Sequence, residues 1–139
     1  MQSESYEGGF GQTPGNEAQG GTTYCSVSCF ALAPKEFNLQ LSLGERDACV
    51  DWLVHRQIVG FQGRTGKVPD ACYSFWCGAA LSVSLLSILR LVLINLVQIL
   101  GVGNLVDHEA NASFIDTCQF KFGGIAKAPD EHPGPYGRH

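Results

Sequence analysis

Apolar residues recur along this chain with the period of an α-helix. A helix is predicted from about Glu45 to Gln57, and one of its faces would carry Cys49, Trp52, Leu53 and Arg56. Further along, a second such face would carry Val106, Ala110, Phe114, Ile115 and Cys118. Another helix, from about Thr22 to Ala33, should end before Pro34 because proline cannot continue it. No stretch alternates in the manner of a β-strand, so an all-α fold is predicted.

Glycines followed by an apolar residue mark a repeat within the chain. They occur at Gly8–Phe10, in a degenerate form at Val59–Phe61, and again at Gly123–Ile125. Helical segments lie beside each of them, so the repeating unit is a helix, a glycine turn and a second helix. Repeats of this length usually stack as supersecondary units. The sequence therefore predicts an array of helical hairpins.

The spacing of these repeats is uneven. Phe61 follows Phe10 by 51 residues, whereas Ile125 follows Phe61 by 64, and the excess coincides with Val83–Gln98, which has no acidic residue and no polar face. Three interpretations are open: a membrane span, a native buried helix, or an insertion foreign to the fold such as a retained intron. A span would place Arg90 near the bilayer centre, at a cost of roughly 2.5–3.5 kcal/mol. The insertion fits the repeat, since removing the 16 residues shortens the second spacing from 64 to 48, which is close to the first spacing of 51.

Composition limits the classes of protein to which this chain can belong. The chain has 139 residues, of which 45% are hydrophobic and 16% charged, as expected for one folded domain. A net charge of -4 argues against a nucleic-acid partner. The six cysteines contain no C-x-x-C pair, and the first residues lack the basic and apolar regions of a signal peptide. Reduced cysteines and a cytoplasmic location are therefore expected.

Two kinds of candidate site residue stand together around the start of a predicted helix. Asp70 and Cys72 offer a carboxylate and a thiolate, which could form half of a zinc site or could be a capping aspartate and a buried cysteine. Pro69 suits the first turn of that helix. Arg64 and Lys67 precede it in a glycine-bearing loop, where they could bind a phosphate-like anion or could simply be solvated.

Aromatic side chains complete this stretch. Tyr73, Phe75 and Trp76 could form the wall of an apolar pocket, although such residues more often pack in the core. A metal, a diphosphate-sized anion and a large apolar group together suit the transfer of an isoprenoid from its diphosphate to a cysteine thiol. The metal would hold the incoming thiol as a thiolate, and the cations would stabilise the departing diphosphate.

The segment "GFQGRTGKVPDACYSFW" resembles the zinc-site segment of protein prenyltransferase β subunits. "SYEGGFGQTPGNEAQGGTTYC" resembles the preceding repeat of that family, and "CQFKFGGIAKAPDEHP" the following one. The resemblance implies an α/α toroid with a central aromatic funnel, and an α-subunit partner. It also implies that Asp70 and Cys72 are zinc ligands at the catalytic centre, and that Arg64, Lys67 and Tyr73 hold the diphosphate.

Other positions carry the resemblance further. Trp76 matches a residue of the funnel wall, and Lys127 stands where geranylgeranyltransferases of type I have a lysine and farnesyltransferases a magnesium-binding aspartate. Gln19 replaces a histidine that contacts the diphosphate in the family. The family's third zinc ligand falls at Gly137, so His139, two residues on, is the candidate here.

The resemblance implies that residues 1–139 are a C-terminal portion of a β-subunit toroid, with 83–98 as an insertion. The implied reaction is zinc-dependent transfer of a geranylgeranyl group from geranylgeranyl diphosphate to a cysteine near the C-terminus of CaaX-type proteins. Alternatives are a farnesyltransferase β subunit, a non-catalytic helical fragment and, from the apolar run alone, a small membrane protein. The length of the isoprenoid is not encoded in these residues.

Overall fold

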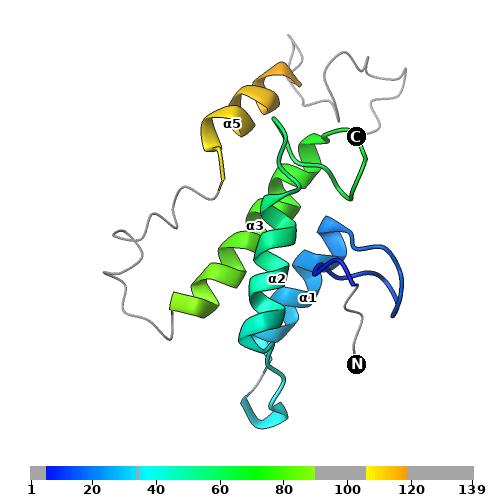
Figure 1. The fold of residues 1–139 in the computed structure, drawn as a ribbon. Coiled ribbons are helices and arrows are strands. Elements are labelled where there is room, and N and C mark those ends of the chain that lie inside the picture. Colours follow the sequence, from blue (N-terminus) through cyan, green and yellow to red (C-terminus); the bar gives the residue numbers. More distant parts are fainter. Residues whose placement is uncertain (1–5, 34, 90–105, 119–139) are drawn as a thin grey trace, which may run out of the picture.

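The computed structural model describes residues 6–33, 35–89 and 106–118 (Figure 1). The elements in these residues are helix α1 (Gly20–Leu32), the short 3-10 helix η1 (Lys35–Phe37), and helices α2 (Leu43–Val54), α3 (Ala71–Leu89) and α5 (His108–Thr117). No strand is found in this part of the chain, and two isolated β-bridges lie in the connection between α2 and α3. The predicted all-α fold is confirmed.

The helix ends follow local hydrogen bonding. Helix α2 begins two residues before the predicted Glu45, because Ser42 and Glu45 form a capping box in which each side chain accepts from the other's backbone N–H. It ends three residues before the predicted Gln57, where the amide of Gln57 turns back to the carbonyl of Val54. Helix α1 stops one residue before the predicted Ala33, just ahead of the proline, as expected.

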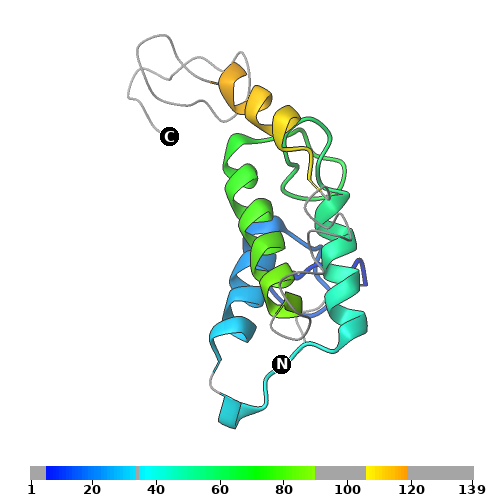
Figure 2. The same ribbon diagram turned by 90° about the vertical axis from the view of Figure 1, so that its left-hand side faces the viewer.

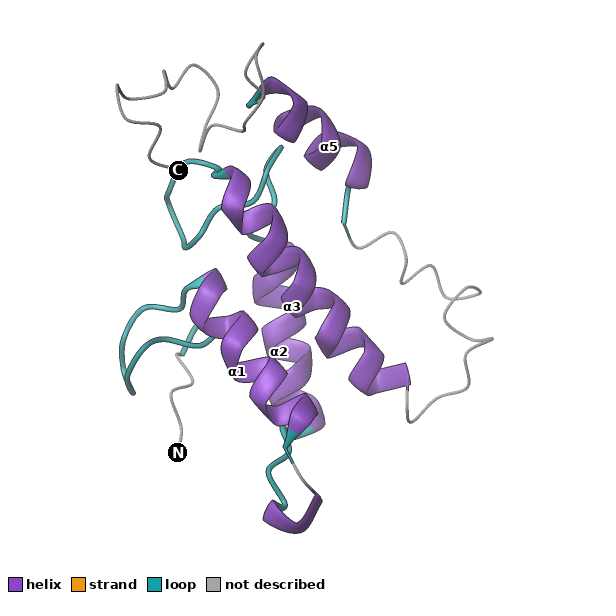
Figure 3. Cartoon of the chain, turned by 180° about the vertical axis from the view of Figure 1, so that it is seen from behind, coloured by secondary structure: helices purple, strands orange, loops and turns teal. Residues whose placement is uncertain are grey.

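Helix α3 crosses both α1 and α2 and forms the main core with them (Figures 1 and 3). The predicted inner face is confirmed, because three of its members are buried on α2, namely Cys49, Trp52 and Leu53, and the fourth, Arg56, is buried two residues beyond the end of that helix. From the other elements the core receives Phe10, Val27, Phe61, Cys77 and Leu81. Three helices thus share one apolar centre, which fixes their relative positions.

A buried arginine connects α2 to the loop that precedes α3. Arg56 is 8% exposed, and its guanidinium lies 4.9 Å from the ring centroid of Trp52. Its Nε donates to the carbonyl of Trp52 at 3.2 Å, and its Nη1 donates to Oγ1 of Thr65 at 2.7 Å. A buried cation is tolerated only when it is well hydrogen-bonded. The contact with Thr65 therefore holds residues 57–70 of the connection between α2 and α3 (the 60s loop) against the end of α2.

Helix α5 packs where the 60s loop meets the start of α3 (Figure 2). A Cβ atom at Gly60 would collide with the ring of Phe114, which explains the glycine of this repeat. Phe114 and Cys118 are buried, as predicted for this helix face. Side-chain hydrogen bonds join Ser74 to Asn111 at 2.7 Å, so α5 is fixed to α3 by polar as well as apolar contacts.

The predicted insertion begins inside helix α3. Val83 packs against the core and Ser84 is 3% exposed, while residues 90–98 lie outside the described part of the chain. Among the helices that the structure describes, none combines the length and the apolar character needed to cross a bilayer. The insertion of 83–98 therefore stays a prediction, and its first residues are helical and packed.

Deleting Val83–Gln98 tests that prediction directly. The deletion would put Ile99 and Leu100 in place of Val83 and Ser84, so two apolar side chains would meet the same core. We expect the shortened chain to keep cooperative urea unfolding and to be more soluble, because an apolar surface is removed. Circular dichroism during unfolding and the soluble fraction after expression provide the measurement. A deletion variant without cooperative unfolding would show that the segment belongs to the fold.

Candidate functional site

The start of α1 and the 60s loop meet at a backbone hydrogen bond. The amide of Gly20 donates to the carbonyl of Gly63 at 2.8 Å. Gly20 is the first residue of α1, so its N–H has no partner within the helix and the loop supplies one. Gln19 caps the same helix, since its Oε1 accepts from the amide of Thr22 at 3.0 Å. Residues more than 40 positions apart are thereby brought together.

The ring of Tyr73 fills the space between these two segments. A Cβ atom at Gly63 would collide with the ring, and one at Gly20 would lie 3.0 Å from its Cδ1 and 2.7 Å from Sγ of Cys77. Both positions are glycine because of this close approach. The Tyr73 hydroxyl accepts a hydrogen bond from Nε2 of Gln19 at 2.6 Å. Two predicted site residues, Gln19 and Tyr73, are therefore in direct contact.

Burial keeps two titratable side chains of this region protonated. Desolvation raises the pKa of the Tyr73 phenol above its ordinary value, and the neighbouring Cys72 raises it further, whereas the hydrogen bond from Gln19 lowers it. The phenol therefore stays protonated at neutral pH and can donate to an anion. Burial also raises the pKa of Cys77 to about 12, so this thiol is inert.

A wide polar depression opens beside Tyr73. Its volume is about 510 Å³, and it is lined by Gln12, Asn16, Glu17, Gln19, Arg64 and Tyr73. Three predicted diphosphate residues, Gln19, Arg64 and Tyr73, are thus brought to one surface. The start of α1 lies at the same place, where the helix dipole favours an anion.

Glu17 is a member of this depression that the sequence did not predict. Its Oε2 lies 2.8 Å from Nη1 of Arg64, and both side chains are about half exposed. An exposed ion pair of this kind contributes only ~0–1 kcal/mol. A bound anion could therefore exchange with the Glu17 carboxylate at little cost. The two residues are 47 positions apart, so no local signal indicates the pair.

Lys67 shares a turn with Arg64 but does not line the depression. The amide of Lys67 donates to the carbonyl of Arg64 at 3.3 Å, and Gly66 between them has φ +72, which favours glycine. The Lys67 side chain is exposed. It borders the depression only through the turn that it shares with Arg64.

Asp70 and Cys72 lie at the start of α3, as predicted. Asp70 is 5% exposed, its amide donates to the carbonyl of Phe61 at 3.0 Å, and its Oδ1 accepts from the amide of Cys72 at 3.1 Å. The capping role of Asp70 is therefore present. The alternative of a buried cysteine is wrong, because Cys72 is exposed.

The side chains of Asp70 and Cys72 are of the types that zinc binds, a carboxylate and a thiolate. The hydrogen bond from the Cys72 amide fixes the orientation of the Asp70 carboxylate. In the part of the chain that the structure describes, no group of three His, Cys, Asp or Glu side chains could hold a metal ion. His139, the third predicted ligand, and Lys127 lie outside the described residues. The zinc site of Asp70, Cys72 and His139 therefore stays a prediction.

An aromatic cluster forms across α1 and α3. The ring centroids of Tyr24 and Trp76 are 5.5 Å apart, those of Tyr24 and Phe75 5.6 Å, and those of Phe75 and Trp76 4.9 Å. Phe75 is 57% exposed, whereas Tyr24 packs against the main core, so the cluster lies at the edge of the core with one open ring. Tyr24 joins it instead of Tyr73, which the sequence had grouped with Phe75 and Trp76.

Comparison with known proteins gives consistent matches. A model of the prenyltransferase alpha-alpha toroid domain matches residues 1–138. The chain is 36% identical to the geranylgeranyl transferase type-1 subunit beta of Arabidopsis thaliana over 96% of its length, and 40% identical to that of Dictyostelium discoideum over 93%. It is 47% identical to the protein farnesyltransferase subunit beta of Arabidopsis thaliana, over 55% of its length.

A solved structure gives the same picture. The Candida albicans protein geranylgeranyltransferase-I complexed with GGPP matches with a TM-score of 0.64 and 27% identity, over 94% of this chain and 36% of that one. The chain covers 33% and 32% of the two type-1 relatives. It therefore spans about a third of the length of the proteins it matches.

The packing of Tyr73 predicts the effect of a single added methyl group. Gly63→Ala should destabilise the chain by about 1–3 kcal/mol, because the new Cβ would collide with the Tyr73 ring. Gly78→Ala is the matched control: it lies in α3 with nothing near its Cβ position, and should stabilise the helix by about 0.5–1 kcal/mol. Urea unfolding measures both variants. Equal stability of Gly63→Ala and wild type would mean that Tyr73 does not fill this space.

Proposed function

The chain belongs to the prenyltransferase alpha-alpha toroid family, and we propose that it forms part of the β subunit of a type I protein geranylgeranyltransferase. The family match confirms the expected α/α toroid fold. One observation carries the choice of type: the type-1 relatives match over more than nine-tenths of the chain, whereas the farnesyltransferase relative matches over little more than half.

The polar depression would bind the diphosphate of geranylgeranyl diphosphate. Arg64 offers a planar pair of donors that suits phosphate oxygens, and the protonated Tyr73 hydroxyl offers another donor. Lys67 would add charge from the border of the depression. Lys127 would contribute the positive charge that magnesium supplies in farnesyltransferases. These groups would stabilise the charge that develops as diphosphate departs.

The aromatic cluster would hold the isoprenoid chain. Trp76, Phe75 and Tyr24 offer apolar ring faces, and Trp76 lies one turn along α3 from Tyr73. One ligand could thus lie along α3, with its diphosphate in the depression and its hydrocarbon chain on the aromatic cluster. The upstream part of the family fold would provide the rest of the funnel.

Asp70, Cys72 and His139 would hold the zinc ion. When bound, zinc lowers the pKa of an incoming thiol, which makes that thiol a nucleophile at neutral pH. The thiol would come from a CaaX-type protein C-terminus. Its sulfur would form a bond to the first carbon of the isoprenoid while the carbon–oxygen bond breaks and diphosphate leaves with the electron pair. Asp70, held by three hydrogen bonds to backbone groups, would keep the ligand set in place.

A farnesyltransferase β subunit is the second candidate, favoured by the 47% identity over 78 residues to the Arabidopsis thaliana protein. Both candidates imply an α-subunit partner and a cytoplasmic enzyme. Magnesium distinguishes them, because Lys127 would replace the ion. Turnover by the assembled enzyme should be largely independent of magnesium if it is type I, and a strict requirement would indicate the farnesyltransferase.

Charge removal tests the diphosphate site. Arg64→Ala and Lys67→Ala, each in a β subunit completed with its α partner, should weaken binding of geranylgeranyl diphosphate by about 1.5–3 kcal/mol. Glu17→Gln is the control: it removes the carboxylate that pairs with Arg64, so affinity should stay the same or increase. Isothermal titration calorimetry measures all three. Unchanged affinity in both cation variants would mean that these residues are only solvated loop charges.

Zinc content tests the metal ligands. The completed β subunit should contain about one zinc per chain, and Cys72→Ala should lose it because a thiolate ligand is removed. Cys25→Ala changes another exposed cysteine, on α1, and should leave the zinc content unaltered. Atomic emission spectrometry after dialysis gives the result. Equal zinc in wild type and Cys72→Ala would exclude this cysteine as a ligand.

A further inference from the structure

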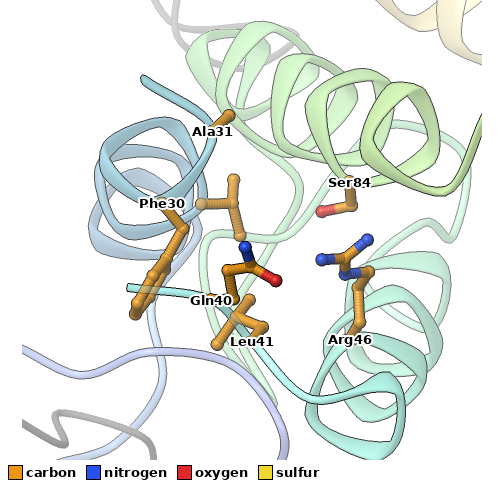
Figure 4. Close-up of a pocket in the computed structure, with 7 residues that line it drawn as sticks. Phe30, Ala31, Gln40, Leu41, Arg46 and Ser84 are labelled. Carbon is orange, nitrogen blue, oxygen red and sulfur yellow. The ribbon is translucent and has the colours of Figure 1, made fainter. Parts of the chain in front are cut away.

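A small cavity lies between α1, α2 and α3, apart from the depression around Tyr73. Its volume is about 40 Å³, and its lining consists of Val27, Phe30, Ala31, Gln40, Leu41, Arg46 and Ser84 (Figure 4). None of these residues lines the depression. A cavity needs roughly 10–15 Å³ to hold one water molecule, so this one admits a few waters or a small ion but no organic ligand.

Two hydrogen-bonding groups in this cavity are buried and have no partner in the part of the chain that the structure describes. Nη1 of Arg46 and Oγ of Ser84 both lack a hydrogen-bond partner within the described residues, and Ser84 is only 3% exposed. Figure 4 shows the Arg46 guanidinium and the Ser84 hydroxyl on the same side of the cavity, with the Gln40 amide facing them. An unsatisfied buried polar group is costly, and two beside one cavity point to a guest that both can contact.

The chemistry of these groups specifies the guest. A guanidinium can only donate hydrogen bonds, and it carries a permanent positive charge. The Ser84 hydroxyl and the Gln40 amide can donate as well, and the lining contains no carboxylate. Apolar neighbours such as Val27 and Leu41 lower the local dielectric, which strengthens the attraction of the guanidinium for a negative charge. We propose that the cavity binds one small inorganic anion, such as chloride.

This anion would join the three helices of the core. Arg46 is on α2 and Ser84 on α3, and Val27 closes the cavity from α1. The guest would thus contact a site that exists only when the helices are assembled. An anion that binds only the folded chain raises the stability of that chain with its concentration.

Thermal unfolding of the full chain tests the site with the anion alone. Sodium gluconate is replaced stepwise by sodium chloride at constant ionic strength, and the melting temperature should rise and saturate. Arg46→Gln should lose this rise, while Lys35→Gln, which removes a cation of η1 that does not line the cavity, should keep it. Ser84→Ala should raise the half-saturating chloride concentration about fivefold, the equivalent of one hydrogen bond of ~1 kcal/mol.

Crystals soaked in bromide give an independent measurement that requires no variant. An anomalous peak within hydrogen-bonding distance of Arg46 Nη1 and Ser84 Oγ is expected. A melting temperature that does not respond to chloride, an equal response in Arg46→Gln, or a cavity without bromide would each overturn the proposal and show that water alone fills the space. Deleting Val83–Gln98 replaces Ser84 by Leu100, so that variant should also lose the chloride response.

Discussion

The ring of Tyr73 lies between Gly20 and Gly63, and its position governs the candidate site. Because neither neighbour has a side chain, the start of α1 can approach the 60s loop closely enough for the Gly20 amide to bond the Gly63 carbonyl. That bond places Gln19 against the Tyr73 hydroxyl and Arg64 beside the N-terminus of α1. The polar depression is therefore a consequence of two missing Cβ atoms.

The buried Arg56 side chain also holds the 60s loop in this position. Arg56 is buried against Trp52, and its bond to Thr65 holds the loop that carries Gly63 and Arg64. Leaving a guanidinium unpaired in such a place would cost several kcal/mol, so the loop and the end of α2 are expected to move as one unit. The core thus positions the site through directional contacts as well as through apolar packing.

The sequence predicts those features of the fold and of the site that depend on a local pattern of residues. The buried face of α2 follows from helical spacing, and the site stretch follows from residue types that suit one chemistry. The parts that depend on tertiary contact were not predictable. Glu17 reaches Arg64 across 47 positions, and Tyr24 on α1 joins the rings of α3. Lys127 and His139 lie outside the described residues, so their contribution to the site stays a prediction.

Amide hydrogen exchange at Gly20 tests most directly whether the close approach of α1 and the 60s loop builds the site. The first amides of a helix ordinarily exchange fast, because they have no partner within the helix. If the Gly63 carbonyl holds the Gly20 amide, exchange should require an opening free energy close to that of global unfolding. Exchange at the rate of an exposed loop amide would show that the two segments are not joined, and would contradict this account of the site.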